Sequence, residues 1–152
     1  MNSIKGKFAL VTGGTQGLGA AIAKNFAENG AEGIITIGRK EEKGKEVAKK
    51  IQEETGCKVI FVKTDLPNVQ ECRNAVSVAK KNFGKLDILV NAAGITDRGN
   101  IVNTSEELFD KMIGTNVKGP FFLIQETVKI MIDQGIQGSI INIGSVSALT
   151  GQ

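Results

Sequence analysis

The stretch FALVTGGTQGLGAAIA, residues 8–23, decides how the rest of the chain is interpreted. It begins as an apolar run of strand type and passes through a glycine-rich turn. Leu18, Ile22 and Phe26 then recur at the four-residue spacing of a helix. Glycines at such a turn let the backbone approach a pyrophosphate closely, and the N–H groups that begin the helix attract its charge. The stretch predicts a strand–turn–helix unit that binds phosphates, with a glycine-rich turn without a ligand as the alternative.

Apolar runs and helical segments alternate along the rest of the chain. Runs rich in valine and isoleucine predict four more strands, at residues 34–37, 59–62, 86–90 and 140–143. Segments with helical spacing lie between them, and Gly30, Gly56 and Gly84 stand where helices should end. Because strands alternate with helices, we expect an α/β protein with a doubly wound parallel sheet, forming a single domain over residues 1–152.

A longer helical region, residues 105–134, contains an interruption. Ser105 is suited to cap its first turn, in which acidic residues follow. A polar, glycine-bearing break at residues 114–120 precedes the apolar segment at 121–132. We expect a kink or two helices in tandem here. Since the second part is apolar nearly all round, it should be deeply buried or lie at an interface between subunits.

The composition excludes several classes of function. The net charge is only +3 and no basic tract with interleaved aromatic residues occurs, so no nucleic-acid partner is expected. No apolar run approaches the ~20 residues needed to cross a bilayer. The two cysteines form no metal-binding pattern, and a cytoplasmic protein without a metal or a membrane partner is predicted. Neither histidine nor tyrosine occurs, which excludes a Ser-His-Asp triad and a tyrosine acid within these residues.

The end of the second predicted strand bears on the choice of cofactor. A carboxylate at this position accepts a hydrogen bond from the ribose 2′-OH of NAD. The sequence has Gly38 instead, followed by Arg39, whose guanidinium can pair with a 2′-phosphate. This arrangement favours NADP, with NAD as the alternative. If it binds no cofactor, Arg39 simply begins the charged helix that follows.

Small and polar residues also follow the other predicted strands. Residues 91–94 (NAAG) come after the fourth strand, which lies beside the first at the position where such sheets bind ligands. Asp65, after the third strand, faces the same edge and either contacts the ligand or forms an Asx turn. Asn116 and Ser145 are expected there too, and a serine hydroxyl can donate to a substrate oxygen that gains negative charge. A structural role is the alternative for Ser145.

Taken together, these motifs resemble those of the short-chain dehydrogenase/reductase family. The matching motifs cover nearly the whole chain: Thr12-Gly13-xxx-Gly17-Leu18-Gly19, Asp65-Leu66, Asn91-Ala92-Ala93-Gly94, Asn116, and IINIGSVSALTG around Ser145. The resemblance implies a Rossmann-type parallel sheet with strand order 3-2-1-4-5 in this chain. It also implies hydride transfer between a nicotinamide cofactor and a carbonyl or secondary alcohol, and a homo-oligomer, either a dimer or a tetramer.

The resemblance further implies a role for each matching residue. The glycines of the first motif would hold the pyrophosphate, Asp65 would contact adenine, and Asn91 would brace the sheet behind the cofactor. Asn116 would hold a water in a proton relay, and Ser145 would orient and polarise the substrate oxygen. The full set expected at the cofactor is Gly13, Thr15, Gln16, Gly17, Leu18, Gly19, Arg39, Asp65, Leu66, Asn91, Ala92, Ala93 and Gly94.

The central acid/base of that family is a tyrosine, assisted by a lysine one helical turn further on. No residue of this chain matches either, and the resemblance implies that both come just beyond Gln152. Without them we expect weakened cofactor binding and little or no turnover, since general acid–base catalysis typically contributes ~10²–10⁴-fold. The alternative is a non-catalytic dinucleotide-binding module that is complete at 152 residues.

Overall fold

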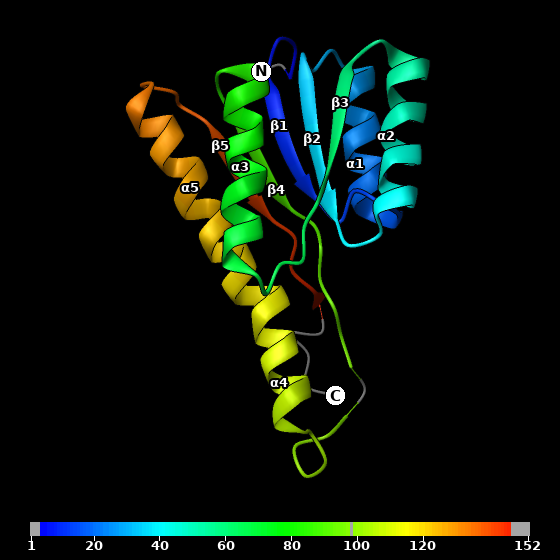
Figure 1. Cartoon of the computed structure of the whole chain (residues 1–152), viewed down its shortest axis with the longest axis vertical. Coiled ribbons are helices and arrows are strands. Elements are labelled where there is room, and N and C mark those ends of the chain that lie inside the picture. The colour runs from blue at the N-terminus through cyan, green and yellow to red at the C-terminus, as the bar shows by residue number, and fades with distance from the viewer. Residues whose placement is uncertain (1–3, 98, 147–152) are drawn as a thin grey trace.

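A five-stranded parallel sheet forms the centre of the computed structural model, which describes residues 4–97 and 99–146 (Figure 1). The strands lie in the order β3-β2-β1-β4-β5, and every neighbouring pair is parallel. Their bounds are β1 Phe8–Thr12, β2 Gly33–Gly38, β3 Lys58–Lys63, β4 Ile88–Asn91 and β5 Ser139–Asn142. The predicted Rossmann-type sheet and its strand order are therefore confirmed.

Helices cover both faces of this sheet (Figure 1). On one face lie α1 (Gly17–Glu28) and α2 (Glu41–Thr55), and on the other lie α3 (Val69–Phe83) and α5 (Gly119–Asp133). The strands supply apolar side chains to each face in turn: Leu10 packs with the α3 and α5 side, whereas Val11 packs with the α1 and α2 side. Such strands must be apolar along their whole length, which explains their continuous apolar runs.

Glycine ends the second and third helices as the sequence predicts. Gly56 and Gly84 both cap their helices in the left-handed conformation, and the N–H of each donates to a carbonyl of the last turn. The first helix differs by one residue, because Asn29 is its cap and Gly30, at φ +88°, follows. The glycines leave the chain free to turn back toward the next strand.

The long helical region consists of two α-helices in tandem, as expected. The first, α4 (Glu106–Ile113), is capped by Ser105, whose hydroxyl accepts the N–H of Leu108. A five-residue π-helix, η1 (Gly114–Lys118), joins it to α5, and the N–H of Gly119 donates to the carbonyl of Gly114. Pro120 comes next and has no N–H to donate, so the widened turn lies where the regular bonding pattern has to be interrupted.

The apolar helix α5 is buried only along one side. Leu123, Ile130 and Met131 lie in the core, whereas Phe121 is 57% exposed and Ile132 is 74% exposed. The expectation of deep burial therefore holds for only part of the segment, and an interface between subunits stays a prediction. In the part of the chain that the structure describes, no helix has both the length and the apolar character needed to cross a membrane.

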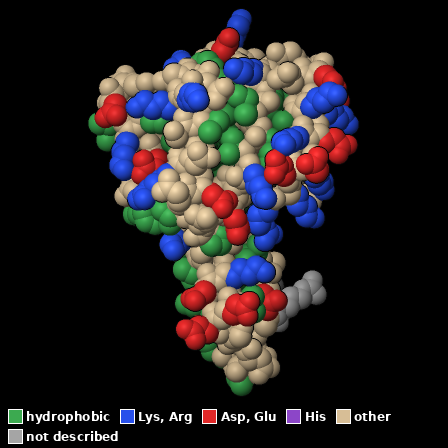
Figure 2. All heavy atoms as spheres, viewed as in Figure 1, with side chains coloured by type: hydrophobic (Ala, Val, Ile, Leu, Met, Phe, Trp, Pro, Cys, Tyr) green, Lys and Arg blue, Asp and Glu red, His purple; other side chains and the backbone are tan. Residues whose placement is uncertain are grey.

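Charge is distributed unevenly over the molecule. On the face that Figure 2 shows, basic and acidic side chains are mixed over the sheet and its covering helices. Acidic side chains predominate on the narrower part, where α4 projects beyond the sheet (Figures 1 and 2).

Asp87, just before β4, connects three strands at the amino-terminal end of the sheet. Its side chain is only 4% exposed, and it accepts the N–H of Phe8 at 2.9 Å and the ammonium of Lys7 at 3.3 Å. Lys85 lies 3.6 Å from its other oxygen. The backbone carbonyl of Asp87 accepts the N–H of Ser139, at the start of β5.

We expect Asp87→Ala to lower the free energy of unfolding by about 1–3 kcal/mol, because the amide of Phe8 loses its acceptor inside the protein. Urea denaturation followed by circular dichroism measures this change. The matched control is Asp133→Ala, which removes an exposed carboxylate at the end of α5 and should change stability by less than about 0.5 kcal/mol. Equal midpoints for the two variants would contradict the role given to Asp87.

Candidate functional site

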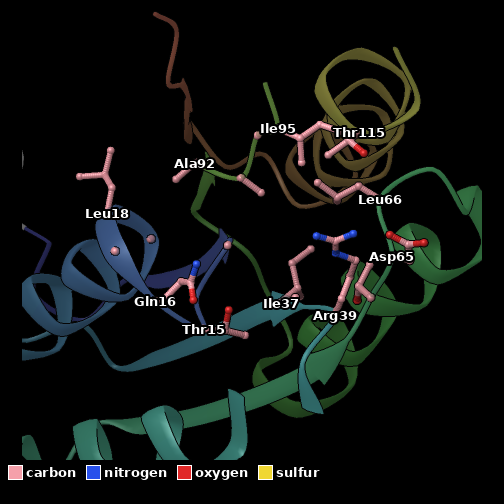
Figure 3. Close-up of a pocket in the computed structure, with 17 residues that line it drawn as sticks. Thr15, Gln16, Leu18, Ile37, Arg39, Asp65, Leu66, Ala92, Ile95 and Thr115 are labelled. Carbon is pink, nitrogen blue, oxygen red and sulfur yellow. The ribbon is translucent and has the colours of Figure 1, made fainter. Parts of the chain in front are cut away.

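A cavity of about 310 Å³ lies at the carboxyl ends of the central strands (Figure 3). At this point the strand order reverses, because the chain leaves β1 toward one edge of the sheet and β4 toward the other. Ligands usually bind at this position in such folds. Among the residues expected at the cofactor, those that line the cavity are Gly13, Thr15, Gln16, Gly17, Leu18, Gly19, Arg39, Asp65, Leu66, Ala92, Ala93 and Gly94. The structure thus brings together residues from four separate segments of the sequence.

The glycine-rich turn needs glycine for two different physical reasons. Gly13 has φ +72°, a left-handed conformation that other residues adopt at a cost. At Gly19 the problem is space, because a Cβ there would lie 2.5 Å from the carbonyl oxygen of Gly13. With both glycines in place, α1 begins close to the end of β1, and the first residues of α1, Gly17 to Gly19, line the cavity.

Thr12 joins the two loops that form the cavity wall. Its side chain is completely buried, and its hydroxyl accepts the N–H of Ala92 at 2.9 Å and the N–H of Ala93 at 2.8 Å. These bonds hold the turn after β4 against the end of β1. The sequence motif includes Thr12, but its spacing alone does not reveal this role, since the two partners lie 80 and 81 residues further along the chain.

The end of β2 presents a guanidinium and no carboxylate. Arg39 extends into the cavity between Ile37 and Asp65 (Figure 3). No carboxylate oxygen of the described residues lies within ion-pair distance of it. A Cβ at Gly38 would lie 2.8 Å from the methyl of Thr15, so a side chain there would have to displace Thr15.

The third strand ends in a hydrogen-bonded turn at the cavity. The backbone carbonyl of Asp65 accepts the N–H of Asn68, so backbone rather than side-chain oxygen closes this turn, and the Asx turn considered for Asp65 is not formed. The N–H of Asp65 donates to Glu71 at 2.7 Å. Cys72 donates to the carbonyl of Leu66, and burial raises the pKa of its thiol to about 11, which keeps it neutral at pH 7.

Asn116, in the π-helix, fastens the far side of the cavity. Its Oδ1 accepts the N–H of Ile95 at 2.9 Å, and its Nδ2 donates to the carbonyl of Ile95 at 2.8 Å. Asn116 itself does not line the cavity, although its neighbours Ile95 and Thr115 do. The observed function of this side chain is thus to hold the loop that follows β4.

Two further predicted residues lie outside the cavity. Asn91 is buried, and its amide nitrogen donates to Oδ1 of Asn142 across the β4–β5 pair at 2.9 Å. It lines a second, more open hollow of about 300 Å³, together with Asn116 and Phe121. Ser145 follows β5 and is exposed, and it lines neither hollow.

Other lining residues could not be identified from the sequence. They are Ile37, Gly38, Thr64, Ile95 and Thr115. Of these, Gly38 was considered only for the carboxylate that it lacks. Thr64, Ile95 and Thr115 each adjoin an expected site residue in the sequence, and Ile37 lies two residues before Arg39, so proximity to those residues was the available signal. Nothing in their residue types indicated a ligand. Among the described residues, no group of acidic, cysteine or histidine side chains could hold a metal ion.

The sheet order and the cavity at its carboxyl edge define an α/β protein of the Rossmann type. The family can be stated as well. The sequence model described as short chain dehydrogenase matches residues 7–152, and the chain belongs to this family.

Relatives of known sequence agree with this assignment. An oxidoreductase of Thermotoga maritima, described only as uncharacterized, is 42% identical over 149 residues, which make up 98% of this chain and 57% of that protein. The short-chain dehydrogenase reductase 3a of Arabidopsis thaliana is 32% identical, over 97% of this chain and 56% of the relative.

Solved structures show the same similarity. A short chain dehydrogenase of Burkholderia cenocepacia, in complex with NADP, has a TM-score of 0.89 and 34% identity, and the match covers 99% of this chain and 60% of that one. L-sorbose reductase of Gluconobacter frateurii, complexed with NADPH and L-sorbose, has a TM-score of 0.92 and 31% identity. The match covers 97% of this chain and 55% of that one. The chain therefore spans little more than half the length of these relatives.

Thr12→Val should lower the free energy of unfolding by about 1–3 kcal/mol, because two amides in the cavity wall lose their acceptor while the side-chain volume is kept. The exchange of the Ala92 and Ala93 amide hydrogens should become faster, which NMR measures residue by residue. Thr12→Ser keeps the hydroxyl and should leave both amides protected. Equal exchange in the two variants would show that the hydroxyl does not hold this loop.

Proposed function

We propose that this protein is an oxidoreductase that transfers a hydride between NADP(H) and a carbonyl or secondary alcohol of a small molecule. Membership of the short-chain dehydrogenase family supports the reaction class. The observation that carries the cofactor choice is the guanidinium of Arg39, which extends into the cavity without a carboxylate partner among the described residues. Nothing in the described part of the chain favours a purely non-catalytic module.

The cavity fits a dinucleotide on structural grounds. Its glycine turn leaves the space that a Cβ would fill at Gly19, and it presents the N-terminus of a twelve-residue helix. In the proposal Gly13, Gly17 and Gly19 hold the pyrophosphate. Asp65 contacts the adenine ring, and the apolar turn at 92–94 gives the rest of the cofactor a surface to lie against.

Three observations support NADP(H) over NAD(H). Gly38 has no carboxylate to accept a bond from a ribose 2′-OH, and Thr15 occupies the space where a side chain would begin. Arg39 offers a planar set of donors that suits a phosphate. The relative from Burkholderia cenocepacia was solved with NADP, and L-sorbose reductase with NADPH.

Bound NADP(H) supplies or accepts the hydride. In the proposal the Ser145 hydroxyl donates a hydrogen bond to the substrate oxygen and so stabilises the charge that develops there. Asn116 holds the loop of Ile95 in place, and a water held near this residue relays the proton. Since residues 1–152 contain no tyrosine or histidine, neither type supplies that proton from within them. The tyrosine and lysine that the family resemblance implies remain predictions.

The assembly and location follow as further parts of the proposal. The exposed side of α5, which includes Phe121 and Ile132, suits contact with a second copy of the chain in a dimer or tetramer. We infer a cytoplasmic protein from the two cysteines, both of which are buried and unpaired. Size-exclusion chromatography with light scattering tests the first point.

Arg39→Ala should weaken NADPH binding about 10- to 100-fold, the loss expected for charge-assisted hydrogen bonds to a phosphate. NADH binding should change by less than about twofold, because NADH has no 2′-phosphate. Fluorescence titration with each dinucleotide measures both constants. Arg73→Ala is the matched control, since Arg73 lies on α3 and faces Glu126 and Phe122 instead of the cavity. Tighter binding of NADH than of NADPH by the unaltered protein would overturn the cofactor choice.

Ser145→Ala should lower kcat about 10²–10³-fold when the protein as it occurs is assayed for NADPH oxidation against a panel of ketones and aldehydes. The dissociation constant for NADPH should not change, because the hydroxyl is assigned to the substrate. Val146→Ala, at the exposed neighbouring position, is the control. NADPH binding without turnover of any compound in the panel would point instead to a non-catalytic module.

A further inference from the structure

A hydrogen bond crosses the rim of the cavity between residues 27 positions apart. The ammonium of Lys43, in the first turn of α2, donates to Oε1 of Gln16 at 2.8 Å. Gln16 belongs to the glycine-rich turn and lines the cavity, whereas Lys43 does not line it directly. The bond therefore brings a positive charge from the neighbouring helix to the mouth of the cavity.

We propose that Lys43, held by Gln16, is a second cation for the 2′-phosphate of NADP(H), and that the pair contributes with Arg39 to the preference for NADP(H) over NAD(H). This inference rests on the proposed function, because it assigns two more residues to the cofactor choice made there. It concerns specificity for the cofactor, and neither residue is assigned to the chemical step.

Lys43 differs from other lysines of the same helix in its partner. Lys45, Lys49 and Lys50 each pair with a glutamate one turn away, at 2.7, 3.6 and 3.9 Å. In the described chain no carboxylate lies within 4 Å of the Lys43 ammonium, whose one hydrogen bond goes to the neutral amide of Gln16. A neutral acceptor leaves the charge of the ammonium uncompensated, and two of its three N–H donors stay available.

The position of Lys43 also runs against the preference of its helix. The first turn of a helix favours acidic residues, since the N–H groups at that end carry partial positive charge. Glu41 and Glu42 follow this preference, and Lys43 next to them does not. A residue that breaks a local rule in this way is expected where it serves a site, and an anion at the rim would compensate the positive charge gathered there.

Two cationic groups lie at or next to residues that line the cavity, Arg39 directly and Lys43 through Gln16. Figure 3 shows Gln16 and Arg39 on opposite sides of Ile37, and the ammonium of Lys43 is hydrogen-bonded to Gln16. Among the described residues Asp65 is the one carboxylate that lines the cavity, and it lies beyond Arg39 (Figure 3). A 2′-phosphate carries a charge of about −1.5 to −2 at pH 7 and can accept bonds from both cations.

Lys43→Gln tests the inference, because it removes the charge and keeps a polar side chain. NADPH binding should weaken about tenfold and NADH binding should change by less than about twofold. Lys43→Arg, which restores the charge, should recover most of the NADPH affinity. Lys49→Gln is the matched control, since it removes the same charge two turns from the rim and should change neither constant.

Gln16→Glu tests the part assigned to the amide. The variant keeps an acceptor for Lys43, but its carboxylate neutralises the ammonium and repels the phosphate, so NADPH should bind about tenfold more weakly or worse. In the Lys43→Gln background, Gln16→Glu should still weaken NADPH binding, because the carboxylate repels the phosphate. NADH binding should stay within about twofold in both backgrounds.

The series separates this inference from the proposed function. If Lys43→Gln leaves NADPH binding unchanged, or weakens NADPH and NADH equally, the inference is overturned. Arg39→Ala, measured alongside, then shows whether the preference for NADPH depends on Arg39 alone. If the unaltered protein shows no preference for NADPH, the cofactor choice fails, and the assignment of Lys43 and Gln16 fails with it.

Discussion

The rest of the site depends on the two hydrogen bonds that the hydroxyl of Thr12 accepts. This hydroxyl accepts two backbone N–H groups of the turn after β4 from a completely buried position at the end of β1. One small side chain therefore sets the distance between the glycine-rich turn and the opposite wall of the cavity. In a buried position the two amides have no water to replace this acceptor, which is why the contact constrains the backbone so strongly.

The other walls are fastened by side-chain contacts to the backbone in the same manner. Asn116 holds both the N–H and the carbonyl of Ile95, and the thiol of Cys72 contacts the carbonyl of Leu66. Asn116 belongs to the π-helix between α4 and α5, so this helix carries the side chain that holds the loop after β4. Of the 17 described residues that line the cavity, seven are glycine or alanine, and these contacts hold the backbone that carries several of them.

The electrostatics of the cavity come from a few charges at its edges. The helix that begins at Gly17 has its N-terminus at the cavity, where a helix carries partial positive charge, and Arg39 adds a guanidinium at the end of β2. Lys43 reaches the rim through Gln16. The contribution of each charge depends on its partners, because a cation paired with a carboxylate has little left to offer a phosphate. The lysines of α2 show both situations on one helix.

The sequence by itself determined the order of strands and helices, the glycine-rich turn and the residues at the strand ends. These features follow from local rules, since burial on both faces requires continuous apolar runs and a sharp turn against a helix requires glycine. The sequence also located the interruption of the helix before Pro120, but it did not reveal that a π-helix forms there. Only the tertiary structure decided that Thr12 binds the turn after β4, that Asn116 holds Ile95, and that Lys43 meets Gln16. The physical reason is that these partners lie 80, 21 and 27 residues apart, and their side chains come within hydrogen-bond distance only when the folded sheet and its helices have brought these segments together.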